Sequence, residues 1–175
     1  ELPNLFALLD RVWRAADAEA TIDLATSLYS LLCRLGKPRL LERVGQIRDT
    51  AAAALGDVWS DARFEATRTQ IEQQLDSGQL REALAGAQHL LQRAREAGEQ
   101  AYPAADYDLA LACAVLARAL WTSGGPERAV PLLDEARRRF ETIAKERPGK
   151  GAERMASACI TEQGECLLSL GRLDE

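Results

Sequence analysis

Four cysteines and one histidine are the side chains of this sequence best suited to metal binding or nucleophilic catalysis. Structural zinc sites use four thiolate or imidazole ligands, usually from closely spaced pairs, and a nucleophilic cysteine needs a neighbouring base. Cys33, Cys113, Cys159 and Cys166 lie singly within apolar stretches, and His89 is the only imidazole. We therefore expect buried free thiols that act as small hydrophobic residues, a surface histidine, and neither a metal site nor a catalytic centre.

Three further groups have the composition of functional motifs without their full spacing. The stretch 149–151, Gly-Lys-Gly, lacks the strand and the glycine spacing of a phosphate-binding loop, so we expect it to end a helix. The arginines at 137–139 point about 100° apart on a helix, and with a net charge of −5 this favours a solvated face over a nucleic-acid site. Glu162 and Glu165 share a helical face, and we expect them to contact a protein partner rather than to do acid–base chemistry.

The elements that must position these residues are helices, because apolar residues recur three and four positions apart on either side of turn glycines. The turns are expected at Gly36, Gly78, Gly124 and Gly171. The chain is 47% apolar and has no alternating run rich in Val, Ile and Thr, so we predict an all-α fold. The clearest copy of the pattern comprises Cys113, Leu116, Ala117, Leu120, Ala129, Leu133 and Ala136.

About eight helices are predicted, with boundaries at capping residues, glycines and prolines. Asn4 is expected to cap the first helix, Thr21 to open the second, and Pro38 to take the first position of the third. The helix that begins at Ala104 is apolar nearly all round and should be the most buried. The expected ranges are 4–18, 21–35, 38–55, 58–77, 79–97, 104–123, 126–147 and 152–170.

A small residue lies seven positions before the turn glycine in the two best copies, as Ala117 and Gly164. Such a residue lets the backbones of paired helices approach closely. Ile71 and Tyr29 occupy the same position in the two earlier copies. Because one pair of helices cannot bury both of its faces, we expect successive pairs to stack on each other.

The pattern resembles the tetratricopeptide repeat family, whose first helix carries Leu-Gly followed by an aromatic residue and whose second carries Ala, an aromatic residue and Ala. Leu120, Leu167, Ala87 and Leu133 stand at the aromatic positions here. The turn glycines are 42, 46 and 47 residues apart, against about 34 in the standard repeat, which is similar to the long helices of kinesin light chains and of large multidomain bacterial regulators. The resemblance implies a right-handed superhelical solenoid of antiparallel helix pairs.

On this basis residues 1–175 form one repeat domain, with divergent helices at 1–57 and repeat units at 58–98, 104–147 and 152–175. The last unit stops where its second helix should begin, so we expect a fragment of a longer protein. The face left open on the last helix should be covered by further repeats or, through self-association, by another copy of the chain.

The resemblance also implies a concave groove, lined by the first helix of each pair, that binds a peptide or helix of a partner. A groove of mixed charge would suit a peptide that carries both signs; the alternative is that its side chains only bridge neighbouring helices. Trp121 could anchor a partner, as could Trp13 and Trp59, although the helical phase of all three favours core packing. The groove positions are Arg68, Glu72, Ala114, Arg118, Trp121, Thr161 and Glu165.

The expected function is a protein-interaction scaffold in a larger bacterial protein, with no catalysis and no cofactor in this chain. Free thiols and the lack of a signal peptide or an apolar span favour the cytoplasm, and neither nucleic acid nor membrane is expected as a partner. One alternative is a regulatory arm that senses a ligand or another domain of a signalling protein. A weaker alternative is part of a helical enzyme.

Replacing Ala117 by leucine tests the proposed close approach of the paired helices. The added atoms should force the pair apart and lower the free energy of unfolding by about 1–3 kcal/mol. Urea denaturation of both proteins measures the difference, and equal midpoints would mean that the small-residue contact is misplaced.

Overall fold

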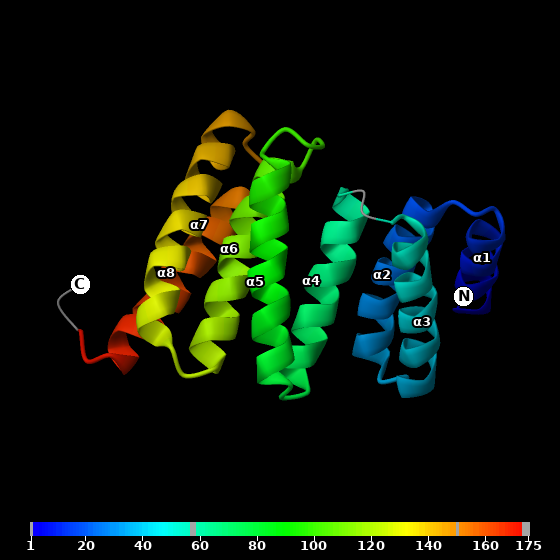
Figure 1. Cartoon of the computed structure of the whole chain (residues 1–175), viewed down its shortest axis with the longest axis horizontal. Helices are drawn as coiled ribbons and strands as arrows, with labels where there is room; N and C mark the ends of the chain where they lie inside the picture. Colours follow the sequence, from blue (N-terminus) through cyan, green and yellow to red (C-terminus); the bar gives the residue numbers. More distant parts are fainter. Residues whose placement is uncertain (1, 57–58, 150, 173–175) are drawn as a thin grey trace. The chain divides into compact units, whose positions relative to one another are not determined.

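The structure, a computed structural model, describes residues 2–56, 59–149 and 151–172. It is all-helical, and no strand occurs in these ranges (Figure 1). The predicted all-α class is therefore confirmed. The eight helices are α1 (Leu2–Arg14), α2 (Ala18–Leu35), α3 (Pro38–Ala54), α4 (Asp61–Asp76), α5 (Leu80–Ala97), α6 (Ala105–Thr122), α7 (Pro126–Glu146) and α8 (Ala152–Ser169).

All four predicted glycine turns are present at the ends of helices. Gly36, Gly78, Gly124 and Gly171 have φ values between +60° and +85° and lie within two residues of the ends of α2, α4, α6 and α8. Glycine reaches this left-handed region without a steric penalty, which is why it ends helices so often. At the first of these turns the N–H of Lys37 also donates to the carbonyl of Leu32, which satisfies one of the last carbonyls of α2.

Two predicted helix starts are wrong. Asn4 lies inside α1, which already begins at Leu2. The cap of α2 is Asp17, whose carboxylate accepts a hydrogen bond from the N–H of Ala20 at 3.1 Å, whereas Thr21 lies within the helix and is fully buried. Aspartate and threonine are both good caps, and only the backbone geometry distinguishes them. The predicted start of the fourth helix at Val58 lies outside the described residues, and α4 begins at Asp61.

The chain forms two compact units, Glu1–Thr69 and Gln70–Glu175, and α4 contributes to both. In the first unit, Leu28 of α2 and Val44 of α3 belong to a core that also includes Leu9 of α1. A second cluster joins Ile22 and Ala51 to the beginning of α4. These helices therefore bury their apolar stripes against one another, as their 3.6-residue periodicity requires.

The second unit is organised around α6. Helices α5, α6, α7 and α8 run alongside one another, and α6 packs against both α5 and α7 (Figure 1). Twelve of its eighteen residues are buried, more than in any other helix, so the prediction of a most-buried helix is confirmed. Ala117, the predicted small contact, is fully buried.

The unexpected Ile71 at a small-residue position is explained by its neighbour on the facing helix. A Cβ placed on Gly86 of α5 would lie 3.1 Å from Cγ1 of Ile71, so the glycine supplies the room that the isoleucine takes. The pair α4 and α5 thus has a large residue on the first helix and a small one on the second. In the next pair, the small residue, Ala117, is on the first helix.

Substitutions at Ile71 and Gly86 should be coupled. Gly86→Ala gains helix propensity of about 1 kcal/mol but crowds Ile71, so its net gain should be smaller; Ile71→Ala alone should cost about 2–5 kcal/mol. In the double variant the crowding is gone and the new methyl group fills part of the cavity. We expect a favourable coupling of at least about 0.5 kcal/mol in a urea-denaturation cycle, and strict additivity would contradict the contact.

Candidate functional site

The candidate site lies where α6 and α8, the first helices of successive predicted pairs, meet. Both helices pack on α7, and they also contact each other directly. From Ala112 to Leu120 every residue of α6 except Arg118 is buried. The Nη2 of Arg118 donates to Oε1 of Glu162 on α8 at 2.9 Å, which ties the two helices together at their surface.

Three other predicted groove residues lie around this ion pair. Thr161 and Glu165 are exposed on α8, and Trp121 is half-buried one turn after Arg118 on α6. Ala114, also predicted to line the groove, is buried, with 8% of it exposed, and we leave it out of the surface described here. We define the α6–α8 surface as Arg118, Trp121, Thr161, Glu162 and Glu165.

Arg68 and Glu72, the remaining predicted groove residues, lie on α4. Both are half-buried, and Arg68 donates to Oε2 of Glu65 on the same helix at 2.7 Å. Arg68 belongs to the first compact unit and Glu72 to the second. The surface described here therefore comprises residues of α6 and α8 alone.

The other two tryptophans contribute to packing. Trp13 packs against the cluster that contains Ile22, and Trp59 meets the ring of Phe64 edge to face at 6.3 Å between centroids. Trp13 and Trp59 are half-buried, as expected for large aromatic side chains that cover a core. Core packing is thus the observed role of these two residues.

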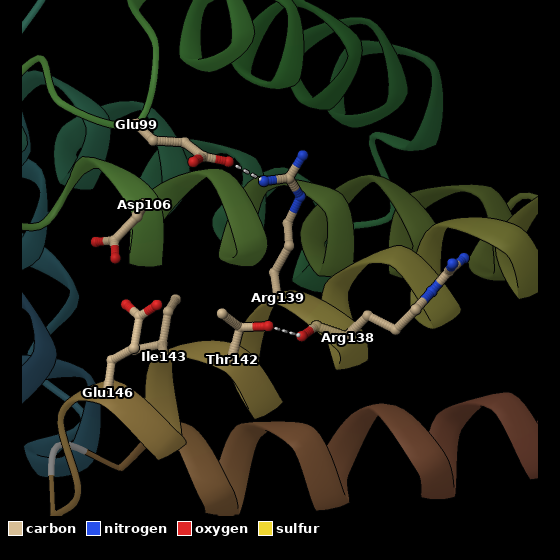
Figure 2. A pocket seen from close by; sticks show the side chains of 7 residues that line it. All are labelled: Glu99, Asp106, Arg138, Arg139, Thr142, Ile143 and Glu146. Carbon is tan, nitrogen blue, oxygen red and sulfur yellow. Dashed lines mark hydrogen bonds and ion pairs between the residues drawn. The ribbon is translucent and has the colours of Figure 1, made fainter.

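A polar cleft of about 270 Å³ was not predicted from the sequence (Figure 2). Its walls come from α7, from the N-terminal turn of α6 and from the segment that joins α5 to α6. Arg139 forms ion pairs with Glu99 and with Glu135, the latter at 3.1 Å, and Arg147 beside the cleft pairs with Asp106. The residues that line the cleft are Glu99, Asp106, Arg138, Arg139, Thr142, Ile143 and Glu146.

Two of these ion pairs, Arg139 with Glu99 and Arg147 with Asp106, connect residues about 40 positions apart in the chain, so no local pattern marks them. Arg137 pairs with Asp134 and Glu141, both at 2.7 Å, and Arg138 pairs with Asp134 at 2.5 Å. The run of three arginines is therefore engaged by acids of the same protein, as expected for a solvated, salt-bridged face. These contacts lie within α7, whereas Arg139 with Glu99 and Arg147 with Asp106 connect its C-terminal half to neighbouring segments.

Three of the four cysteines are buried, and the prediction that all are buried is wrong for Cys33, which is exposed. Burial raises the pKa of the Cys113 thiol to about 12, with a contribution from the negative charge of Glu135, and raises that of Cys159 to about 11. Burial also raises the pKa of Cys166. Protonated thiols in apolar surroundings are poor nucleophiles. His89 is exposed, as predicted.

Neither a metal cluster nor a membrane span is found in the part of the chain that the structure describes. Within residues 2–56, 59–149 and 151–172, no three His, Cys, Asp or Glu side chains are grouped so as to hold a metal ion. None of the helices in these ranges is long and apolar enough to cross a bilayer.

Comparison with known proteins identifies no relative: no protein-family model, no curated protein and no solved structure matches the chain.

Thiol labelling should separate the exposed cysteine from the buried ones. At pH 8 one thiol per chain should react rapidly with Ellman's reagent, and three should react only after denaturation, because Cys113 and Cys159 stay protonated far above that pH. Cys33→Ser should remove the rapid phase. A second rapid thiol in the native protein would contradict the burial of the other three.

Proposed function

We propose that the chain is a protein-interaction module that binds a peptide or helix of a partner at the α6–α8 surface. The observation that carries the proposal is the exposure of Thr161 and Glu165 beside the Arg118–Glu162 ion pair, which joins two helices that both pack on α7. Rigid helices that present a few polar side chains around a half-buried tryptophan suit recognition rather than catalysis.

The charges of this surface favour a partner segment that carries both signs. The side chain of Arg118 is 50% exposed although it pairs with Glu162, so its guanidinium still has donors to offer a carboxylate of the partner. Glu165 can accept a hydrogen bond from a basic side chain. Trp121 adds an aromatic surface on which an apolar residue could pack at little entropic cost.

The same proposal includes the finer architecture. Two observations support a tetratricopeptide-like solenoid: the glycine turns recur at regular intervals, and α5, α6, α7 and α8 each pack against the next helix. In such a solenoid α6 and α8 would lie on the concave side. An interaction scaffold is the function that such an arrangement of stacked pairs serves best.

Selection from a phage-displayed library of random 16-residue peptides tests the proposal, with the full chain immobilised. We expect binders of mixed charge, and we expect Arg118→Ala combined with Glu165→Ala to raise their Kd at least tenfold, about 1.4 kcal/mol. Trp121→Ala should weaken them similarly. The change in Kd can be interpreted as a loss of binding, because loss of one exposed ion pair lowers the free energy of unfolding by only about 0–1 kcal/mol.

The matched control is Arg81→Ala combined with Glu82→Ala, which removes one exposed base and one exposed acid from α5. Its Kd should equal that of the unmodified chain, and circular dichroism should show equal helicity in all variants. Selected peptides that bind the Arg118/Glu165 variant as tightly as the unmodified chain would refute the assigned surface.

A further inference from the structure

Helix α8 repeats α6 with an offset of 47 residues, the distance between their turn glycines. One face of each helix is buried at the same positions in this register. The helices that cover them differ, since α6 packs against α5 and α7, whereas α8 packs against α7 and α6. The pairs buried in both helices are Ala105 and Ala152, Leu109 and Ala156, Ala112 and Cys159, and Ala119 and Cys166.

The second face is buried in α6 and open in α8. Cys113 and Ala117 of α6 are fully buried, but Ile160, at the position of Cys113, is 55% exposed. Gly164, at the position of Ala117, has no atom within 4 Å of where a Cβ would stand. We call Ile160, Gly164 and Leu167 the open stripe of α8; Leu167 is half-buried, and the adjacent Leu168, outside the stripe, is 63% exposed.

A hollow of about 420 Å³ lies between α7 and the N-terminal half of α8, and it reaches the open stripe at Ile160. Ala144 and Lys145 line it from α7, and Glu153, Ala156 and Ile160 line it from α8. An apolar stripe with one residue per turn, next to a hollow and flanked by charges, has the form of a surface that receives a helix.

The charges also repeat in this register. Asp106, in the first turn of α6, pairs with Arg147 at the C-terminal end of α7. The equivalent residue of α8 is Glu153, whose carboxylate is exposed and has no ionic partner among the described residues. Among the described residues, Glu153 of α8 therefore has no basic residue paired with it as Arg147 is paired with Asp106 of α6.

We propose that the open stripe binds an amphipathic α-helix that lies antiparallel to α8, as α7 lies on α6. This helix carries small and leucine residues in the order of Ala129, Leu133 and Ala136 of α7, so that a small residue meets Gly164. Its C-terminal end carries a basic residue that pairs with Glu153. The absent side chain at Gly164 permits the close backbone contact that selects a helix over an extended peptide.

This docking face is separate from the α6–α8 surface. Thr161 and Glu165 each follow a residue of the open stripe by one position, which turns them about 100° around the helix. The two surfaces can therefore be disabled independently, and the failure of one proposal leaves the other standing.

The probe is a fluorescein-labelled peptide with the sequence of residues 126–147, titrated with the full chain and followed by fluorescence anisotropy. We expect saturable binding and a Kd at least tenfold higher for Gly164→Leu, since its side chain fills the contact. Ala158→Leu, which adds the same side chain to an exposed position outside the stripe, is the matched control and should leave the Kd unchanged.

A charge exchange tests the register. Glu153→Arg should weaken the unmodified peptide at least threefold, and a peptide that carries Arg147→Glu should recover the affinity for this variant only. Absence of saturable binding, equal effects of the two leucine variants, or no recovery would overturn the proposal. So would concentration-dependent dimerisation in sedimentation experiments that Ile160→Glu abolishes, because a second copy would then be the occupant.

Discussion

The second compact unit depends on the packing of α6 against α5 and α7 at the same time. Short side chains let two neighbouring helices approach closely, and α6 buries six alanines together with larger residues such as Leu109 and Leu120. Each fully buried leucine contributes about 1.5–3 kcal/mol, and the alanines bring the backbones near enough for those leucines to be enclosed.

The requirement is on the combined volume of facing residues and not on one residue type. In the pair α4 and α5 the large residue is Ile71 on the first helix, and Gly86 on the second helix leaves the space that its side chain occupies. Protein interiors are close-packed, so a large residue on one side must be matched by a small one on the other. This exchange explains how a repeat can diverge in sequence while its helices keep the same spacing.

Ion pairs between the helices align positions on neighbouring elements more than they stabilise the fold. Arg118 with Glu162, Arg139 with Glu99, and Arg147 all connect different elements through side chains that are partly exposed, where such pairs contribute about 0–1 kcal/mol each. Each of them joins one specific position of an element to one specific position of another. Helix α8 therefore has two exposed faces of different chemistry. One belongs to the polar α6–α8 surface, and the other is the apolar open stripe.

Local patterns in the sequence were sufficient to predict the eight helices and most of their ends. Periodicity, turn glycines and prolines placed most boundaries within a few residues, and they identified α6 as the most buried helix, because these signals depend on neighbours in the chain. Thr161 and Glu165, which the resemblance to tetratricopeptide repeats selected, are exposed in the structure. Only the tertiary structure decided that Ala114 is covered, that Cys33 is exposed and that Gly86 accommodates Ile71. These outcomes, like the ion pairs across about 40 residues, depend on which side chains distant helices bring together, and no local pattern encodes that choice.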